Sequence, residues 1–163
     1  MKKLSRATRW AIVVSCVAGV VLLSGLGVAL AQTFSLAPTY GTVALSPGFL
    51  PDPHTKSLVA GGQINTRTSG PAPACGYVAN APDYRLNWSG GSSLYITATS
   101  GSDVTLLINT PTGGWQCNDD SNGTNPLIQF NGAAPGQYDI WVGTYQAGNQ
   151  PAILRISEMG PRW

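Results

Sequence analysis

Apolar and polar residues alternate along several short segments of this chain. In residues 104–108 and 138–142, every second side chain is apolar. Because successive side chains of a strand point to opposite faces, this period of two predicts strands that bury one face against a core. Further strands are expected where the same pattern or a short apolar run recurs between turn residues, at 55–59, 77–79, 84–88, 94–99, 152–157 and directly after Pro126.

About eight such strands, separated by turns, predict the fold class. The chain contains 20 Gly and 12 Pro, and no helical run rich in Leu, Ala, Glu and Lys occurs after position 31. A composition of this kind is typical of all-β proteins. We therefore expect an all-β fold, an antiparallel, jelly-roll-like β-sandwich preceded by one N-terminal hydrophobic helix.

The N-terminus has the pattern of an export signal. Four of the nine Lys and Arg residues lie within residues 1–9, and residues 10–31 are uncharged and largely apolar. Ala29-Leu30-Ala31 is a small-x-small sequence before Gln32, as in a cleaved signal peptide. The length of the apolar run suits a membrane anchor instead. Both interpretations, signal peptide or anchor helix over residues 1–31, predict a periplasmic or extracellular location for the rest of the chain.

The remaining chain is expected to form one domain, because its length suits a single core. We expect a linker at 32–45, a β-sandwich domain at 46–158 and a C-terminal tail at 159–163, with an early strand within residues 40–45 as the alternative to a continuous linker. Beyond residue 9, five basic residues stand against seven acidic ones. This mildly acidic balance argues against a nucleic-acid partner, which needs a clustered basic surface.

Two cysteines, Cys75 and Cys117, lie beyond the N-terminal segment. In a domain that folds outside the cytoplasm, such a pair is expected to form a disulfide. Closing a loop of roughly 40 residues would stabilise the fold by about 4 kcal/mol in the chain-entropy model. The spacing is not that of a C-x-x-C redox motif, and two thiols with the single His54 do not make a zinc site.

The sequence offers no catalytic constellation. A hydrolase triad needs a nucleophile near an oriented base, but the chain has one histidine, His54, and no G-x-S-x-G motif. The adjacent Asp119 and Asp120 point in different directions in an extended segment, so they do not form a glycosidase acid pair. We therefore expect no catalytic residues and no enzymatic activity.

The acidic loop after Cys117 is a candidate calcium site. Asn118, Asp120 and Asn122 alternate before Gly123, as oxygen ligands do in the first half of a calcium loop. No glutamate occupies the bidentate position, where Gln129 stands, so any affinity for Ca²⁺ would be weak. The alternative is a polar turn held by hydrogen bonds of its Asn and Asp side chains. No other cofactor is expected.

Three aromatic residues are candidate ligand-binding residues. Trp115, Trp141 and Tyr145 would form a platform on which a sugar or a peptide could stack. The alternative is that both faces of the strand are covered and these rings belong to the core or its edge.

Several spaced segments together resemble a known family. They are DVTLLINTP at 103–111, CNDDSNGTNPLIQF at 117–130, PGQYDIWVGTY at 135–145 and LRIS at 154–157. In this order they resemble the bacterial pre-peptidase C-terminal domain, over roughly residues 55–158. The resemblance implies a secreted jelly-roll β-sandwich, usually appended to a protease, that acts in substrate binding, secretion or anchoring rather than in catalysis. It also implies calcium, which related collagen-binding modules use.

The sequence therefore predicts a non-catalytic exported module for binding or assembly. If residues 10–31 stay in the membrane, we expect an accessory subunit beside a periplasmic or membrane protein complex. If they are removed, we expect a secreted factor that binds a protein or carbohydrate surface. An accessory domain of a secreted protease is the third interpretation; these 163 residues are too few to hold a protease domain as well, so we expect this role least.

Overall fold

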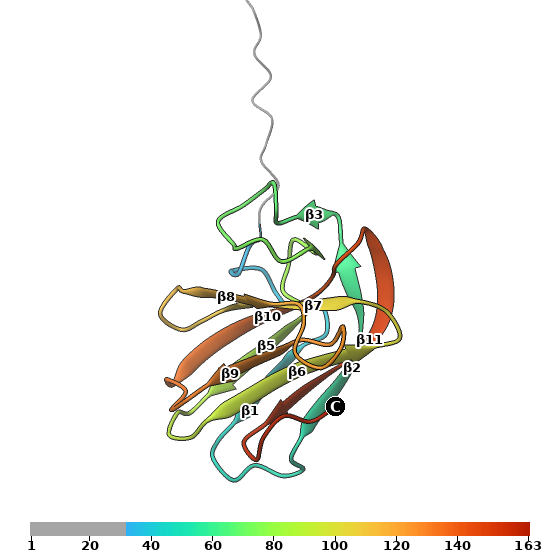
Figure 1. Ribbon diagram of the computed structural model, residues 1–163. Coiled ribbons are helices and arrows are strands. Elements are labelled where there is room, and N and C mark those ends of the chain that lie inside the picture. The colour runs from blue at the N-terminus through green and yellow to red at the C-terminus, as the bar shows by residue number, and fades with distance from the viewer. Residues whose placement is uncertain (1–31) are drawn as a thin grey trace, which may run out of the picture.

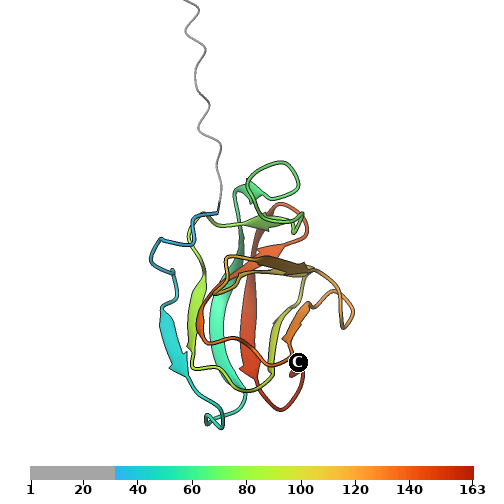
Figure 2. The same ribbon diagram turned by 90° about the vertical axis from the view of Figure 1, so that its left-hand side faces the viewer.

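The computed structural model describes residues 32–163, which form a two-layered β-sandwich (Figures 1 and 2). The hydrophobic helix expected within residues 1–31 lies outside the described residues. Within residues 32–163 no helix is long and apolar enough to cross a membrane. The described strands are β1 (Thr42–Leu45), β2 (His54–Gly62), β3 (Ile64–Asn65), β4 (Tyr77–Val78), β5 (Tyr84–Trp88), β6 (Leu94–Ser100), β7 (Val104–Asn109), β8 (Trp115–Asn118), β9 (Leu127–Phe130), β10 (Gly136–Thr144) and β11 (Gly148–Ser157).

The two layers differ in size. The large sheet has the order β1-β5-β10-β4-β3, with β7 pairing with both β10 and β8. The small sheet has the order β2-β11-β6-β9. All pairs are antiparallel except β1 with β5, which run parallel. The expected all-β sandwich is therefore confirmed, and each segment expected as a strand contains one.

The main core lies between the sheets and consists of the inward side chains of both. Leu86, Ile108 and Ile140 of the large sheet and Ile96 and Ile156 of the small sheet are all fully buried there. Each of these residues lies on the apolar face that the period of two predicts. Burial of this apolar surface is the main contribution to the stability of the sandwich.

A second apolar cluster covers the outer face of the large sheet. Leu107 and Trp141 point away from the main core, and the segment between β3 and β4 packs over them. Cys75 in that segment is bonded to Cys117 in β8, so the expected disulfide is present, with 5.7 Å between the Cα atoms. Because this cover exists, every residue of β7 is buried.

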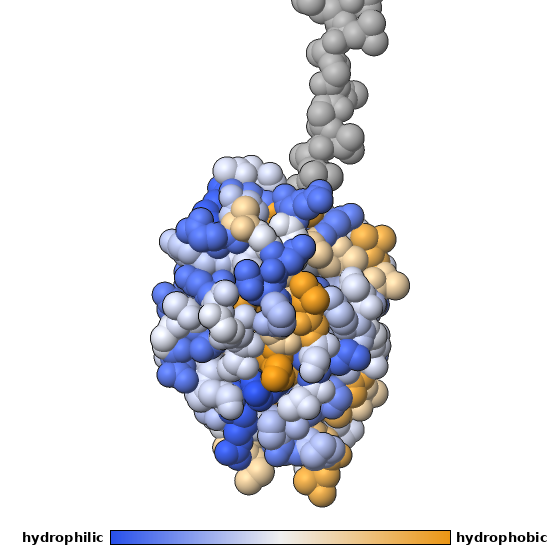
Figure 3. All heavy atoms as spheres, turned by 90° about the vertical axis from the view of Figure 1, so that its right-hand side faces the viewer, coloured by the Kyte–Doolittle hydropathy of each residue, from blue (hydrophilic) through white to orange (hydrophobic). Residues whose placement is uncertain are grey.

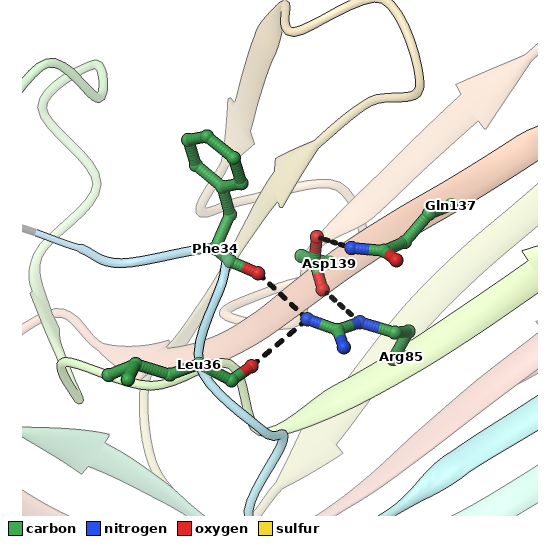
Figure 4. A network of polar contacts seen from close by, with 5 residues as sticks. All are labelled: Phe34, Leu36, Arg85, Gln137 and Asp139. Carbon is green, nitrogen blue, oxygen red and sulfur yellow. Dashed lines mark hydrogen bonds and ion pairs between the residues drawn. The ribbon is translucent and has the colours of Figure 1, made fainter.

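Residues 32–45, which the sequence suggested as a linker, pack on the sandwich. Thr42–Leu45 forms β1, so a strand in this segment, the alternative weighed from the sequence, is present. Figure 4 shows how Arg85 holds the preceding turn: its Nη2 donates hydrogen bonds to the carbonyl oxygens of Phe34 and Leu36, at 2.7 and 3.0 Å. The same guanidinium donates through Nε to Asp139, at 2.6 Å. These contacts join the segment to β5 and β10.

Candidate functional site

A cavity of about 430 Å³ opens at one edge of the sandwich, and we call it the β2-edge cavity. One wall is the end of β2, from Val59 to Gly62. The other wall is formed by Thr39 and Tyr40 before β1 and by residues 79–83 before β5. Gly62 closes one end, because its backbone lies so close to Val78 that a Cβ atom there would be only 2.2 Å from the Val78 carbonyl. The cavity therefore lies between the end of β2 in the small sheet and the segment that leads into β5 in the large sheet.

The strand that borders this cavity has unpaired backbone groups. Among the described strands, β2 pairs only with β11, and Val59 lies opposite Pro151. Because proline has no N–H group, this is a non-hydrogen-bonded pair, and the N–H and C=O groups of Val59 point to the open edge. By the same alternation, those of Ser57 point there too. The Tyr40 hydroxyl accepts a hydrogen bond from the Val59 N–H at 3.1 Å, which protects part of the edge.

A buried carboxyl group lies in the wall of the cavity opposite β2. Asp83 is only 2% exposed, and its Oδ2 accepts a hydrogen bond from the backbone N–H of Val142 at 2.8 Å. The pairing of β10 with β5 ends at Ile140, and its pairing with β4 is at Thr144, so the Val142 N–H lies in a gap of the sheet. The Asp83 side chain fills this gap. No donor to its second oxygen, Oδ1, is found within residues 32–163, and the residue lines the cavity.

Burial changes the acidity of this group. Desolvation raises the pKa of Asp83 from its usual value of 3.8 to about 7, although the hydrogen bond from Val142 opposes the shift. The other polar side chains that line the cavity, such as Gln63, Asn80 and Asn149, are neutral. The cavity therefore presents one acidic group among neutral polar and apolar residues.

The acidic loop has the contacts of a polar turn. Asn118 Oδ1 accepts hydrogen bonds from the Ser121 hydroxyl at 2.9 Å and from the Leu127 N–H at 3.0 Å. Asn122 forms a β-bridge with Asn125. Within residues 32–163, no three side chains of His, Cys, Asp or Glu are grouped to hold a metal ion. The amide oxygen of Asn118 is thus already used, and the calcium site at Asn118, Asp120 and Asn122 stays a prediction.

A nearby aspartate that the sequence did not single out belongs to the same region. Burial raises the pKa of Asp103, and the carboxylates of Asp120 and Asp119 raise it further, whereas Arg67 lowers it. The Arg67 guanidinium lies over the Tyr145 ring, 4.4 Å from its centroid, and donates to the Tyr145 carbonyl oxygen. Tyr145 therefore contacts a cation of its own chain.

The three candidate aromatic residues do not form one exposed platform. Trp141 is fully buried in the second apolar cluster, where its ring packs against Trp115 with 5.3 Å between centroids. Tyr145 is 38% exposed and lies against Arg67. The interpretation of Trp141 as a core residue, the alternative weighed from the sequence, describes its position in the structure.

His54 contacts another ring rather than a nucleophile. Its Nε2 lies 2.9 Å from the Tyr84 hydroxyl, and the two rings stack with 5.8 Å between centroids. Burial lowers the pKa of His54, and the positive charge of Lys56 lowers it further. Neither neighbour is the activated nucleophile that hydrolytic catalysis requires.

Asp83 was missed by the sequence analysis. It comes directly after Ala81-Pro82, a pair typical of an exposed turn, and directly precedes an apolar strand. The only signal was a single acidic residue at a strand end, which is common on protein surfaces. Its burial depends on the gap between β5 and β4, which the local sequence does not reveal.

No family model matches this chain, and neither does any curated protein. Two solved structures are similar in fold. The pre-peptidase C-terminal domain of a collagenase from Bacillus anthracis is 17% identical, with a TM-score of 0.46, and the match covers 71% of this chain and 94% of that one. PliG from Aeromonas hydrophila, a periplasmic inhibitor of g-type lysozyme, is 16% identical, with a TM-score of 0.40 and 71% and 96% coverage.

Proposed function

We propose that this chain is an exported, non-catalytic module that binds another protein along the edge of β2. The observation that carries the proposal is the combination of outward backbone groups at Ser57 and Val59 with the cavity beside them. An extended segment of a partner can add to such an edge, with its main chain hydrogen-bonded to the strand and its side chains held in neighbouring pockets.

The adjoining surface supports a protein partner. Val59 in β2 is 47% exposed, and Ile153 in the neighbouring strand β11 is 38% exposed. Both side chains belong to the outer face of the small sheet. Figure 3 views the molecule from this side and shows apolar side chains gathered in the middle of a largely polar face. A partner strand beside β2 would cover part of this apolar surface, which favours association.

The N-terminal segment and the disulfide support action outside the cytoplasm. Structural disulfides such as Cys75–Cys117 persist in oxidising compartments. If residues 10–31 are retained, the module is an accessory subunit tethered beside a periplasmic or membrane complex. If the chain is cleaved before Gln32, it is a secreted protein-binding factor. The carbohydrate-binding alternative has less support, because Trp141, one of the three candidate aromatic residues, is fully buried.

Site-specific photo-crosslinking tests the proposal. A photoreactive amino acid is introduced at Ser57, on the open edge of β2, or at Asn87, an exposed residue of β5 in the other sheet. In the cells that make the protein, we expect a discrete crosslinked partner from position 57 and none from position 87. Crosslinks from position 87 alone, or from neither position, would contradict binding at the β2 edge.

A further inference from the structure

The buried carboxyl group of Asp83 has no cationic partner among the described residues. Of those that line the β2-edge cavity, none is Lys or Arg. Arg85 in β5 and Lys56 in β2 are both engaged elsewhere. Arg85 pairs with Asp139 at 2.6 Å, and the Lys56 ammonium lies 5.6 Å from the centroid of the Tyr84 ring.

Among the described residues only the Val142 N–H donates to this carboxylate, through Oδ2, so Oδ1 can pair only with solvent or with a ligand in the cavity when the group is ionised. A buried carboxylate without a counter-ion is unstable relative to its protonated form, which is why burial raises the pKa of Asp83 to about 7. A cation that enters the cavity would stabilise the ionised form. It would also give Oδ1 the donor that residues 32–163 do not provide.

The geometry of the edge would direct every second side chain of a partner strand toward the side on which the β2-edge cavity and this carboxyl group lie. A strand that pairs with β2 alternates its side chains between the outer face of the small sheet and the space between the sheets. The β2-edge cavity lies in that space, with Asp83 in the opposite wall. Ile64 and Ala79 line the cavity as well, so the methylene stem of a long side chain would find apolar contacts there.

We propose that the β2-edge cavity binds a lysine or arginine side chain carried by the extended segment of the partner protein, through an ion pair with Asp83. This inference rests on the proposed function and specifies the partner by its charge. An acidic side chain at the same place would be repelled, and a neutral one would leave the carboxylate unpaired. A divalent cation requires more ligands than this single carboxylate offers.

Synthetic peptides provide the test. The probes are capped heptapeptides, Thr-Val-Thr-Lys-Thr-Val-Thr and the same sequence with norleucine, glutamine or glutamate in the central position. They are titrated into the isotope-labelled full-length protein while the amide signals of β2 are followed by NMR. We expect the lysine peptide to shift the signals of Ser57, Val59 and Gly61 and to bind at least about tenfold more tightly than the norleucine peptide.

The variant Asp83→Asn removes the charge but retains an acceptor for the Val142 N–H. We expect it to abolish the preference for lysine while the norleucine peptide binds as before.

A second measurement uses the wild type alone. Because a cation binds the ionised carboxylate, the affinity for the lysine peptide should rise from pH 6 to pH 8, and that for norleucine should not. The other titratable side chain that lines the cavity is Tyr40. His54 and Lys56 contact the Tyr84 ring and do not line the cavity.

The possible outcomes separate this inference from the proposed function. Equal affinities for all peptides, with shifts along β2, would overturn the inference and leave edge binding intact. A lysine preference that persists in Asp83→Asn, or that does not depend on pH, would also overturn it. If no peptide shifts the β2 signals, edge binding fails, and the inference fails with it.

Discussion

Replacing Asp83 by asparagine should change how the stability of this protein depends on pH. In the unfolded chain the carboxyl group has its usual pKa of 3.8, whereas burial raises the pKa in the folded protein to about 7. Between these two values the folded state binds a proton that the unfolded state has released. Raising the pH through this range therefore favours the unfolded state.

The structure sets the size of this effect. A difference of about three pH units between the two pKa values corresponds to about 4 kcal/mol in the free energy of unfolding. The loss proceeds at about 1.4 kcal/mol per pH unit and levels off above pH 7. Between pH 5 and pH 8, the wild type should therefore lose about 2 to 3 kcal/mol through Asp83. Asp83→Asn keeps an acceptor for the Val142 N–H but carries no titrating group, so it should not show this loss.

Urea unfolding of both proteins at several pH values measures the difference. The contributions of His54, Asp103 and the other titrating groups are common to both proteins and cancel when the two free energies are subtracted. The stability of Asp83→Asn relative to the wild type should rise by about 2 to 3 kcal/mol from pH 5 to pH 8. A relative stability that is constant over this range would refute the argument that burial controls this carboxyl group.

The disulfide, the Tyr40 hydroxyl and the acidic loop each allow a further test. Replacing both Cys75 and Cys117 by serine should lower the free energy of unfolding by about 4 kcal/mol, measured by urea unfolding, and an unchanged midpoint would contradict a structural role for the disulfide. Tyr40→Phe removes the acceptor of the Val59 N–H, so it should strengthen the binding of the heptapeptides in the NMR titration; weaker binding would show that the hydroxyl supports the site. If the acidic loop binds Ca²⁺, millimolar calcium should raise the melting temperature of the wild type but not of Asp120→Asn, and equal melting temperatures with and without calcium would refute the site.

The proposal depends on how far the edge of β2 is already protected. Edge strands in natural proteins are often covered or interrupted so that they do not pair with other chains. Here the Tyr40 hydroxyl protects only the Val59 N–H, and the described residues include no strand beyond β2. The exposed positions Thr55 and Ser57 carry small polar side chains that leave room for a partner. This is the physical basis for expecting binding at this edge rather than a closed surface.

Period-two alternation determined most of the fold. The strands at 84–88, 104–108 and 138–142 were predictable because their apolar side chains repeat on one face, which requires a core on that side. The pairing of Cys75 with Cys117 was predictable from the export signal and the number of remaining cysteines. By contrast, β8 was not predicted, because four residues with partly exposed side chains carry too little pattern.

Burial by segments that are distant in sequence could not be predicted from the local pattern. Trp141 lies on the face of β10 that alternation would leave outside, and it is buried because the segment around Cys75 folds over it. Burial raises the pKa of Asp83 to about 7 because β5 and β4 part around this residue. The chain pattern specifies which face of a strand is apolar. Which distant segment covers the other face, and where two strands separate, depends on contacts that form only when the sheets assemble.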